Sequence, residues 1–312
     1  MNKPVFIIGC PRSGTTIMLN IMACHEQLSW VSNYLNSNPT AYRTSSMNRM
    51  YDIPFIGKSL YYIATQKGDL LPTKIRKSLP HPVEPWNFWN THLSNFQWER
   101  FGTIPPRRRT ANDITIDEIN NIVNAVECIQ QAQGKSRFLS KYTDFPRIKY
   151  LTQAFPDAKF VHIVRDGRAV TASYHEKIES GAFATWDERE WWIQGWPAEW
   201  RDEWQARFST PSSFLAFQWK FFLREILSDA VQLPPEQYLE INYTDMINSP
   251  ADVFNHIFEF CELSRSQRVE WYLDSINLIN MNYKWAKKYS DRDKQVLNDV
   301  IHEPDLRSFL DS

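Results

Sequence analysis

Short apolar segments alternate along the chain with longer segments whose apolar residues recur at helical spacing. A short continuous apolar run is typical of a strand that is buried on both faces of a sheet. The pattern predicts strands at 5–8 (VFII), 137–141 (RFLSK), 159–164 (KFVHIV) and 238–243 (YLEINY). It predicts helices at 16–24, 115–133, 146–155, 168–177, 213–231 and 249–262. The alternation predicts an α/β fold with a central parallel sheet flanked by helices.

The helix predicted at 115–133 has a clear start and a clear end. Thr115 and Glu118 have the spacing of a capping box, and Gly134 is placed to end the helix. Residues 34–112 are instead rich in Pro, Asn and aromatic residues, which favours loops and short helices along a cleft wall. Because the chain shows no repeat, low-complexity tract or linker, we expect one domain over residues 1–312.

The stretch GCPRSGTT, which starts at Gly9, connects the first predicted strand to the first predicted helix. Gly9, Gly14 and Thr16 have the spacing of a phosphate-binding loop, but Thr15 stands where such loops have Lys. Backbone N–H groups at a helix N-terminus favour an anion, because the partial positive charge of the helix end faces it. Arg12 adds a cation earlier in the loop. Hydroxyl groups in the loop add further donors: those of Ser13, Thr15 and Thr16.

A second candidate anion site follows the strand predicted at 159–164. Arg165 comes directly after this strand, at the edge where open parallel sheets bind ligands. Ser173 lies two turns into the helix that follows. The sequence therefore predicts two anion sites, each at a turn from strand to helix.

These two stretches together resemble the sulfotransferase family, in particular its bacterial and Golgi-type branch. PRSGTT at 11–16 is similar to the family's loop for the 5′-phosphosulfate of 3′-phosphoadenosine 5′-phosphosulfate (PAPS). RDGRAVTAS at 165–173 is similar to the family's segment for the 3′-phosphate. The resemblance implies a P-loop nucleotide-binding fold. It also implies sulfuryl transfer from PAPS to a hydroxyl or amine, with adenosine 3′,5′-bisphosphate (PAP) as the second product.

Two later stretches extend the resemblance. YLEINYTDM at 238–246 is similar to a family segment that brings Tyr243 near the donor nucleotide. NYKWAKKYS at 282–290 is similar to a segment that folds over the donor, and it contains Lys284. The resemblance implies this donor-binding set: Arg12, Ser13, Gly14, Thr15, Thr16, Arg165, Ser173, Tyr243 and Lys284.

The charge of the leaving phosphate must be neutralised by the protein, because family members work without a metal ion. The resemblance assigns this role to Arg12 and to Lys141 in RFLSKYTDF. Removing one donor aimed at developing charge typically costs ~3 kcal/mol of transition-state stabilisation. The four cysteines form no C-x-x-C pair and no Cys/His cluster with metal spacing, so we expect free thiols and no metal site.

The general base is where the sequence departs from the family. Asn33 and Thr143 stand near the positions where family members carry Glu or His, and neither side chain can accept a proton near neutral pH. The segment HPVEPWNFWN at 81–90 offers Glu84 as the base and His81 as a substitute. Its aromatic residues favour a position at the border of the cleft, where Glu84 could lie against Trp residues. A solvated loop carboxylate remains the alternative.

The acceptor side is less well defined by the sequence. We expect residues 34–112 and 178–212 to be insertions that shape it. In the Trp-rich segment 186–204, Trp192, Trp196, Trp200 and Trp204 recur every four residues. Such a stripe either packs against the protein or forms an aromatic wall for sugar rings or phenols. We expect a small-molecule or glycan acceptor, with lipid, phenol and peptide acceptors also open.

Composition excludes some classes of function. Lys and Arg number 35 against 36 Asp and Glu, so no global charge drives binding to nucleic acid. No apolar run approaches the ~20 residues of a membrane span, and no signal peptide is evident, so we expect a cytoplasmic protein. Two other functions stay open: a small-molecule P-loop kinase and a catalytically inactive nucleotide-binding protein. The sequence does not indicate the oligomeric state.

Overall fold

The computed structural model describes residues 3–66, 78–93, 109–143, 147–182, 196 and 198–301. Five parallel strands form one sheet in the order β2-β3-β1-β4-β5. The strands are β1 (Val5–Ile8), β2 (Leu28–Trp30), β3 (Arg137–Lys141), β4 (Lys159–Val164) and β5 (Tyr238–Asn242). The predicted α/β fold with a central parallel sheet is confirmed, and β2 is the strand that the pattern did not predict.

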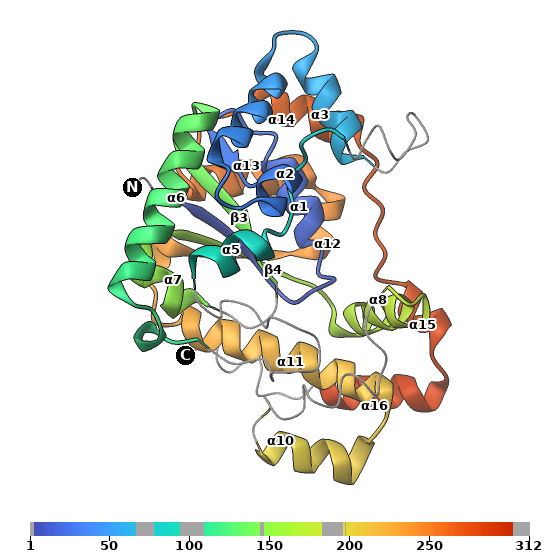
Figure 1. The fold of residues 1–312 in the computed structure, drawn as a ribbon. Helices are drawn as coiled ribbons and strands as arrows, with labels where there is room; N and C mark the ends of the chain where they lie inside the picture. Colours follow the sequence, from blue (N-terminus) through green and yellow to red (C-terminus); the bar gives the residue numbers. More distant parts are fainter. Residues whose placement is uncertain are drawn as a thin grey trace.

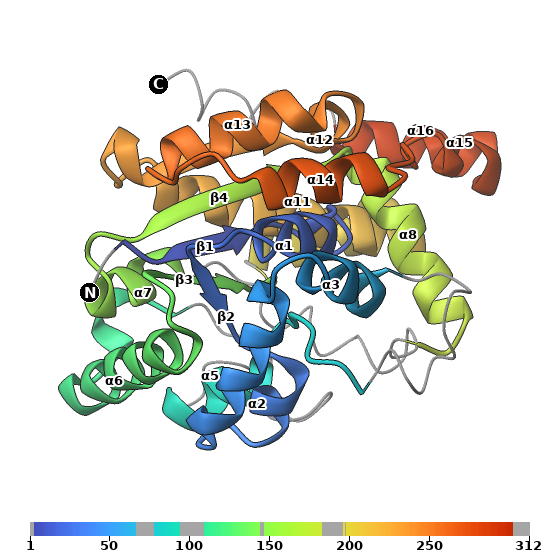
Figure 2. The same cartoon turned by 90° about the horizontal axis from the view of Figure 1, so that it is seen from above.

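Helices cover both faces of the sheet (Figures 1 and 2). The first half of the chain contributes α1 (Thr15–Met22), α2 (Asn33–Ser37), α3 (Gly57–Thr65), α5 (Trp86–His92), α6 (Ile116–Gln133), α7 (Ile148–Ala154) and α8 (Gly167–Glu179). The second half contributes α10 (Ala198–Glu203), α11 (Pro211–Ala230), α12 (Tyr243–Asn248), α13 (Pro250–Phe260), α14 (Gln267–Ser275), α15 (Lys284–Lys288) and α16 (Asp291–Ile301). Short 3₁₀ segments occur at Tyr42–Asp52, Ala111–Asp113 and Pro235–Gln237, and a π-helical turn at Trp204–Phe208.

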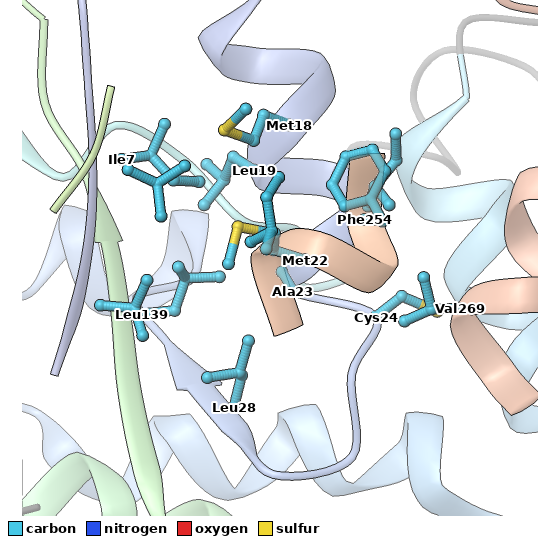
Figure 3. Packing of buried hydrophobic residues seen from close by; sticks show 14 of the residues in the cluster. Ile7, Met18, Leu19, Met22, Ala23, Cys24, Leu28, Leu139, Phe254 and Val269 are labelled. Atoms are coloured by element: carbon cyan, nitrogen blue, oxygen red, sulfur yellow. The ribbon is translucent and has the colours of Figure 1, made fainter. Parts of the chain in front are cut away.

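Alternate residues of β1 enter two different cores. Val5 and Ile7 pack with α1, α13 and α14 on one face, whereas Phe6 and Ile8 pack with α5, α6 and α7 on the other. Figure 3 shows α1 lying over the first face, with Met18 and Leu19 close to Ile7. This packing fixes the axis of α1, so its N-terminus lies at the carboxyl edge of β1.

The ends of α6 match the capping signals in the sequence. The Thr115 hydroxyl accepts a hydrogen bond from the Glu118 backbone N–H, and Glu118 Oε2 accepts one from the Thr115 backbone N–H at 2.8 Å. Gly134 ends the helix with a left-handed backbone (φ 67°). The helix is therefore capped at both ends, as the sequence predicts.

The Trp stripe packs against the protein wherever the structure describes it. The Trp196 ring stacks on Phe214 of α11 at 4.9 Å between centroids, and Trp200 meets Phe217 of the same helix at 6.2 Å. Trp204 also contacts Phe214. These three rings therefore pack α10 and the residues beside it against α11. Trp186, Trp191 and Trp192 lie outside the described residues. None of the helices described in the structure is long and apolar enough to cross a bilayer.

Candidate active site

The carboxyl ends of β1, β3 and β4 bring three cationic side chains to one edge of the sheet. The loop with Arg12 follows β1, Lys141 is the last residue of β3, and Arg165 follows β4. Ile7 of β1 pairs directly with Lys141, and β1 lies between β3 and β4 in the sheet. The three cations come together because parallel strands end at the same edge.

A cavity of about 600 Å³ opens at this edge. Ten of the predicted site residues line it: Arg12, Gly14, Thr15, Thr16, Glu84, Lys141, Arg165, Ser173, Tyr243 and Lys284. The two others do not line it: Ser13 is a buried residue of the loop, and His81 lies outside the lining. The lining carries four cationic side chains and two acidic ones, Glu84 and Glu176, so its net charge favours an anionic ligand.

The loop after β1 depends on a glycine at its end. Gly14 caps α1 with φ 97°, a left-handed conformation that residues with a Cβ rarely adopt. A Cβ on Gly14 would lie 2.8 Å from Cδ2 of Tyr243, so this ring rests directly on the loop. The loop therefore presents the N-terminus of α1 to the cavity, the arrangement that binds phosphate groups. The buried Ser13 Oγ has no hydrogen-bond partner among the described residues.

Arg12 links the two predicted anion sites. Its backbone has φ 74°, and its Nε donates a hydrogen bond to Ser173 Oγ at 3.1 Å. Burial lowers the pKa of Arg12, because desolvation disfavours the charged form. A partly desolvated guanidinium interacts more strongly with an anion than a solvated one does.

Arg165 is held from three sides. Its Nη1 donates to the backbone oxygen of Arg12 at 2.8 Å, and its Nε donates to Asn282 Oδ1 at 2.8 Å. The guanidinium lies over the ring of Tyr243, 4.3 Å from the ring centroid. Burial also lowers the pKa of Arg165. Within the described part of the chain its Nη2 makes no hydrogen bond, so it can donate to a ligand in the cavity.

Lys141 bridges the loop and the segment before α5. Its Nζ donates to Thr16 Oγ1 at 2.9 Å and forms an ion pair with Glu84 Oε2 at 3.1 Å. The Lys141 side chain is 6 % exposed and the Glu84 side chain 19 %. A pair with this little solvent around it is screened less than a surface ion pair.

The Glu84 carboxylate is held by Thr143. Glu84 Oε1 accepts hydrogen bonds from the Thr143 backbone N–H at 2.5 Å and from Thr143 Oγ1 at 2.7 Å. The expected aromatic neighbours lie elsewhere, since Trp89 is fully buried against Phe6 and Phe88 in the core. The carboxylate therefore faces a cation and two donors rather than indole rings.

Asn33 supports the segment that carries Glu84. Its Oδ1 accepts a hydrogen bond from the His81 backbone N–H at 3.0 Å, and its own N–H donates to the His81 backbone oxygen at 3.1 Å. The His81 ring nitrogen Nδ1 lies 3.1 Å from the backbone oxygen of Leu79, so the ring lies next to the chain two residues before it. Residue 33 thus positions the chain three residues before Glu84.

Several residues that line the cavity or contact its lining were not predicted from the sequence. Asn282 contacts Arg165 directly, Glu176 lies near Arg12, and Tyr272 and Gln66 form part of the wall. Only Asn282 had a signal, because it begins the stretch NYKWAKKYS. In the described residues no group of three or more His, Cys, Asp or Glu side chains could hold a metal ion.

Comparison with known proteins agrees with this arrangement of loops and cations. The family model described as "Sulfotransferase family" matches residues 4–267. The chain belongs to the sulfotransferase family. The matched range includes both loops, Lys141 and Tyr243. Membership of this family disfavours a kinase.

Individual relatives are distant. An omega-hydroxy-beta-dihydromenaquinone-9 sulfotransferase from Mycobacterium bovis is 24% identical over 181 residues, which covers 55% of this chain and 44% of that protein. The chain thus aligns with less than half the length of this curated relative and of its counterpart in Mycobacterium tuberculosis.

Solved sulfotransferases share the fold. The structure of STF9 from Mycobacterium avium has a TM-score of 0.56 at 13% identity, and covers 99% of this chain and 76% of that chain. STF1 from Mycobacterium tuberculosis has a TM-score of 0.53 at 13% identity, and covers 97% and 77%. These structures support the P-loop type of sulfotransferase fold for this chain.

Proposed function

We propose that the protein transfers the sulfuryl group of PAPS to a hydroxyl or amine of a small-molecule or glycan acceptor. One observation carries the proposal: the two stretches predicted to bind anions line one cavity and are joined by the hydrogen bond between Arg12 and Ser173. A nucleotide with phosphate groups at both its 5′ and 3′ positions fits such a pair of sites. A nucleotide with a single phosphate chain would use only one of them.

In this proposal the loop residues bind the 5′-phosphosulfate, and Arg165 with Ser173 binds the 3′-phosphate. The N–H groups at the start of α1 and the hydroxyls of Thr15 and Thr16 face the 5′ end of the donor. Tyr243 contacts both the loop and Arg165, so it keeps the two sites at a fixed separation. Lys284 adds a cation at the wall formed by the later segment.

The proposed reaction is an in-line displacement at sulfur. The acceptor oxygen or nitrogen forms a bond to sulfur while the bond from sulfur to the bridging oxygen of the 5′-phosphate breaks. The electron pair of the broken bond stays on that oxygen, which leaves as part of PAP. Arg12 and Lys141 stabilise the negative charge that grows there, and donors of this kind are worth most in a partly desolvated site.

Glu84 is the proposed general base. Its carboxylate is the acidic group of the cavity that contacts Lys141, so it lies beside the cation proposed to act on the leaving group. A proton from the acceptor would pass to this carboxylate as the new bond forms. Thr143 holds the carboxylate in place through two hydrogen bonds. The substitute base, His81, does not line the cavity.

The relatives suggest where to look for the acceptor. The curated relatives are named for an omega-hydroxyl group on a dihydromenaquinone. We therefore place lipid alcohols first in an acceptor screen, followed by phenols, glycans and peptides.

The proposal is tested first by calorimetry with EDTA present. We expect PAP to bind at least tenfold more tightly than 5′-AMP, because only PAP occupies both anion sites. ATP with Mg²⁺, titrated separately without EDTA, serves as the comparison for a kinase, and tighter binding of ATP would overturn the assignment. Labelled PAPS is then supplied with the acceptor panel. Tight PAP binding without transfer to any acceptor would favour a nucleotide-binding protein without catalysis.

A further inference from the structure

One wall of the cavity is formed by the chain between α14 and α15. Ile276, Leu278, Ile279 and Met281 in this segment line the cavity, although the segment has no helix or strand. Figure 1 shows it as an extended connection that runs from α14 to α15. Because backbone of this kind has no ladder of hydrogen bonds, its position depends on a few side-chain contacts.

Asn282 supplies the central contacts of this segment. Its Oδ1 accepts the hydrogen bond from Arg165 Nε at 2.8 Å, and its Nδ2 donates to Thr244 Oγ1 at 3.1 Å. The two partners come from different elements, since Arg165 follows β4 and Thr244 lies in α12. The oxygen and the nitrogen of the Asn282 amide therefore both connect the wall to residues at the edge of the sheet.

The chemistry of the partners determines the orientation of the amide. A guanidinium only donates hydrogen bonds, so the atom of Asn282 that faces Arg165 must be the oxygen. The amide nitrogen is then left for Thr244, whose hydroxyl can accept. This arrangement needs an acceptor and a donor on one short side chain, which Asn provides and Ala or Leu does not.

The contact also limits the directions in which Arg165 can point. Its Nε is directed to Asn282 and its Nη1 to the backbone oxygen of Arg12, while Tyr243 covers one face. A planar guanidinium fixed at three places has lost most of its rotamer freedom before a ligand arrives. Binding of a phosphate to Nη2 then requires little further ordering.

We infer that Asn282 is a positioning residue that orients Arg165 for the 3′-phosphate of the donor and couples the 276–283 wall to occupancy of that site. The inference rests on the proposed function, because it assumes that Arg165 binds the 3′-phosphate. Asn282 lies outside the two phosphate-binding motifs. Through Arg165, it contributes to the preference for PAP over nucleotides that have no 3′-phosphate.

The test compares PAP and 5′-AMP as ligands of the full chain, measured by calorimetry. We expect Asn282→Ala to weaken PAP about tenfold, the effect typical of losing a hydrogen bond to a charged group. The same variant should change 5′-AMP affinity less than about twofold, because that ligand does not reach Arg165. Thr244→Val is the matched control: it removes the other contact of Asn282, leaves the contact with Arg165, and should retain the preference for PAP.

The outcomes separate this inference from the proposed function. Equal weakening of both ligands by Asn282→Ala would show that Asn282 only supports the wall, and unchanged affinity for both would also overturn the inference. Arg165→Ala should abolish the preference for PAP. Adding Asn282→Ala to the Arg165→Ala variant should not change PAP affinity further. If the wild-type chain shows no preference for PAP, the proposed function itself fails. Thermal unfolding of each variant identifies any that fail to fold.

Discussion

The Lys141 ammonium lies 3.1 Å from the Glu84 carboxylate, at the point of the cavity where the loop after β1 meets the segment before α5. In the proposed reaction these two groups have different tasks: the cation acts on the leaving phosphate and the carboxylate accepts the proton of the acceptor. Their pairing keeps both charges in a nearly buried place before the donor binds. A buried charge left without a partner is strongly destabilising, so each group also stabilises the other.

Replacing Lys141 by Ala is expected to reduce turnover far more than donor affinity. The ammonium acts on charge that grows in the transition state, so its loss should lower kcat about 10²- to 10³-fold. PAP affinity should change by much less, because the loop and Arg165 remain. Turnover at saturating PAPS and calorimetry with PAP provide the two measurements. A collapse of donor affinity with unchanged saturating turnover would make Lys141 a binding residue only.

Replacing Glu84 by Gln tests the proposed base. Gln retains an oxygen that can accept the hydrogen bonds from Thr143, but it cannot take up a proton. Turnover should therefore fall about 10²- to 10⁴-fold, and the acidic limb of the pH–rate profile should disappear. His81→Ala is the control and should retain both the rate and the limb. Retention of both by Glu84→Gln would exclude Glu84 as the base.

Replacing Thr143 tests whether the Glu84 carboxylate must be held in place. Thr143→Ser retains the hydroxyl and should behave much like the wild type. Thr143→Val removes the 2.7 Å bond to Glu84 but not the one from the backbone N–H, so turnover should fall about tenfold. PAP affinity should be unchanged in both variants. If Ser and Val reduce turnover equally, the hydroxyl does not position the base.

A buried histidine outside the site makes stability dependent on pH. His162 in β4 is fully buried, and its Nδ1 lies 2.6 Å from the Tyr238 hydroxyl and 3.8 Å from Glu240. Burial lowers the pKa of His162 from 6.5 to about 3. Below pH 6.5 the unfolded chain binds a proton that the folded chain does not. The free energy of unfolding should therefore fall as pH drops from 6.5 towards 3, by up to about 1.4 kcal/mol per pH unit.

His162→Gln removes this titration and can retain a hydrogen bond to Tyr238. The slope of unfolding free energy against pH should be smaller in the variant, whatever its absolute stability. Burial raises the pKa of Glu240, so the folded chain binds a proton there more readily than the unfolded chain does. This shift changes the unfolding free energy with pH in the opposite direction to that of His162. Glu240 is present in both proteins, so the difference in slope reports His162. Denaturant titrations at a series of pH values measure it, and equal slopes would contradict the prediction.

The parts of the site that could be predicted from sequence are local ones. Arg165 and the loop that starts at Gly9 each follow a strand directly, so their positions follow from the sheet once its strands are recognised. The strand β2 was missed because its three residues, Leu28–Trp30, are too few to show a pattern.

Contacts between segments that are far apart in the sequence could not be predicted in this way. Glu84 and Thr143 are 59 residues apart, and only the folded chain shows that one holds the other. Glu84 was proposed because two other positions lacked a base, and the aromatic neighbours expected for it belong to the core. The contact between Arg165 and Asn282 spans 117 residues and carries no sequence pattern.

Gly14→Ala should weaken donor binding through Tyr243. An added Cβ would lie 2.8 Å from Cδ2 of this ring and 3.3 Å from Cδ1 of Ile163, so the ring must move from the loop. Moving the ring also removes the face on which Arg165 rests, and both anion sites should lose their geometry. We expect PAP affinity to fall at least about tenfold and stability to fall by about 1–3 kcal/mol, the range for a strained backbone.

Gly181→Ala is the matched control for this prediction. Gly181 also has a left-handed backbone (φ 69°), but a Cβ there would meet nothing within 4 Å. The substitution therefore introduces the backbone strain, about 1–2 kcal/mol, without the steric clash. Gly181→Ala should lower the unfolding free energy while PAP affinity stays at the wild-type value. If the two variants weaken PAP binding equally, general destabilisation rather than displacement of Tyr243 would explain the loss, and the contact between Gly14 and Tyr243 would have no specific role in donor binding.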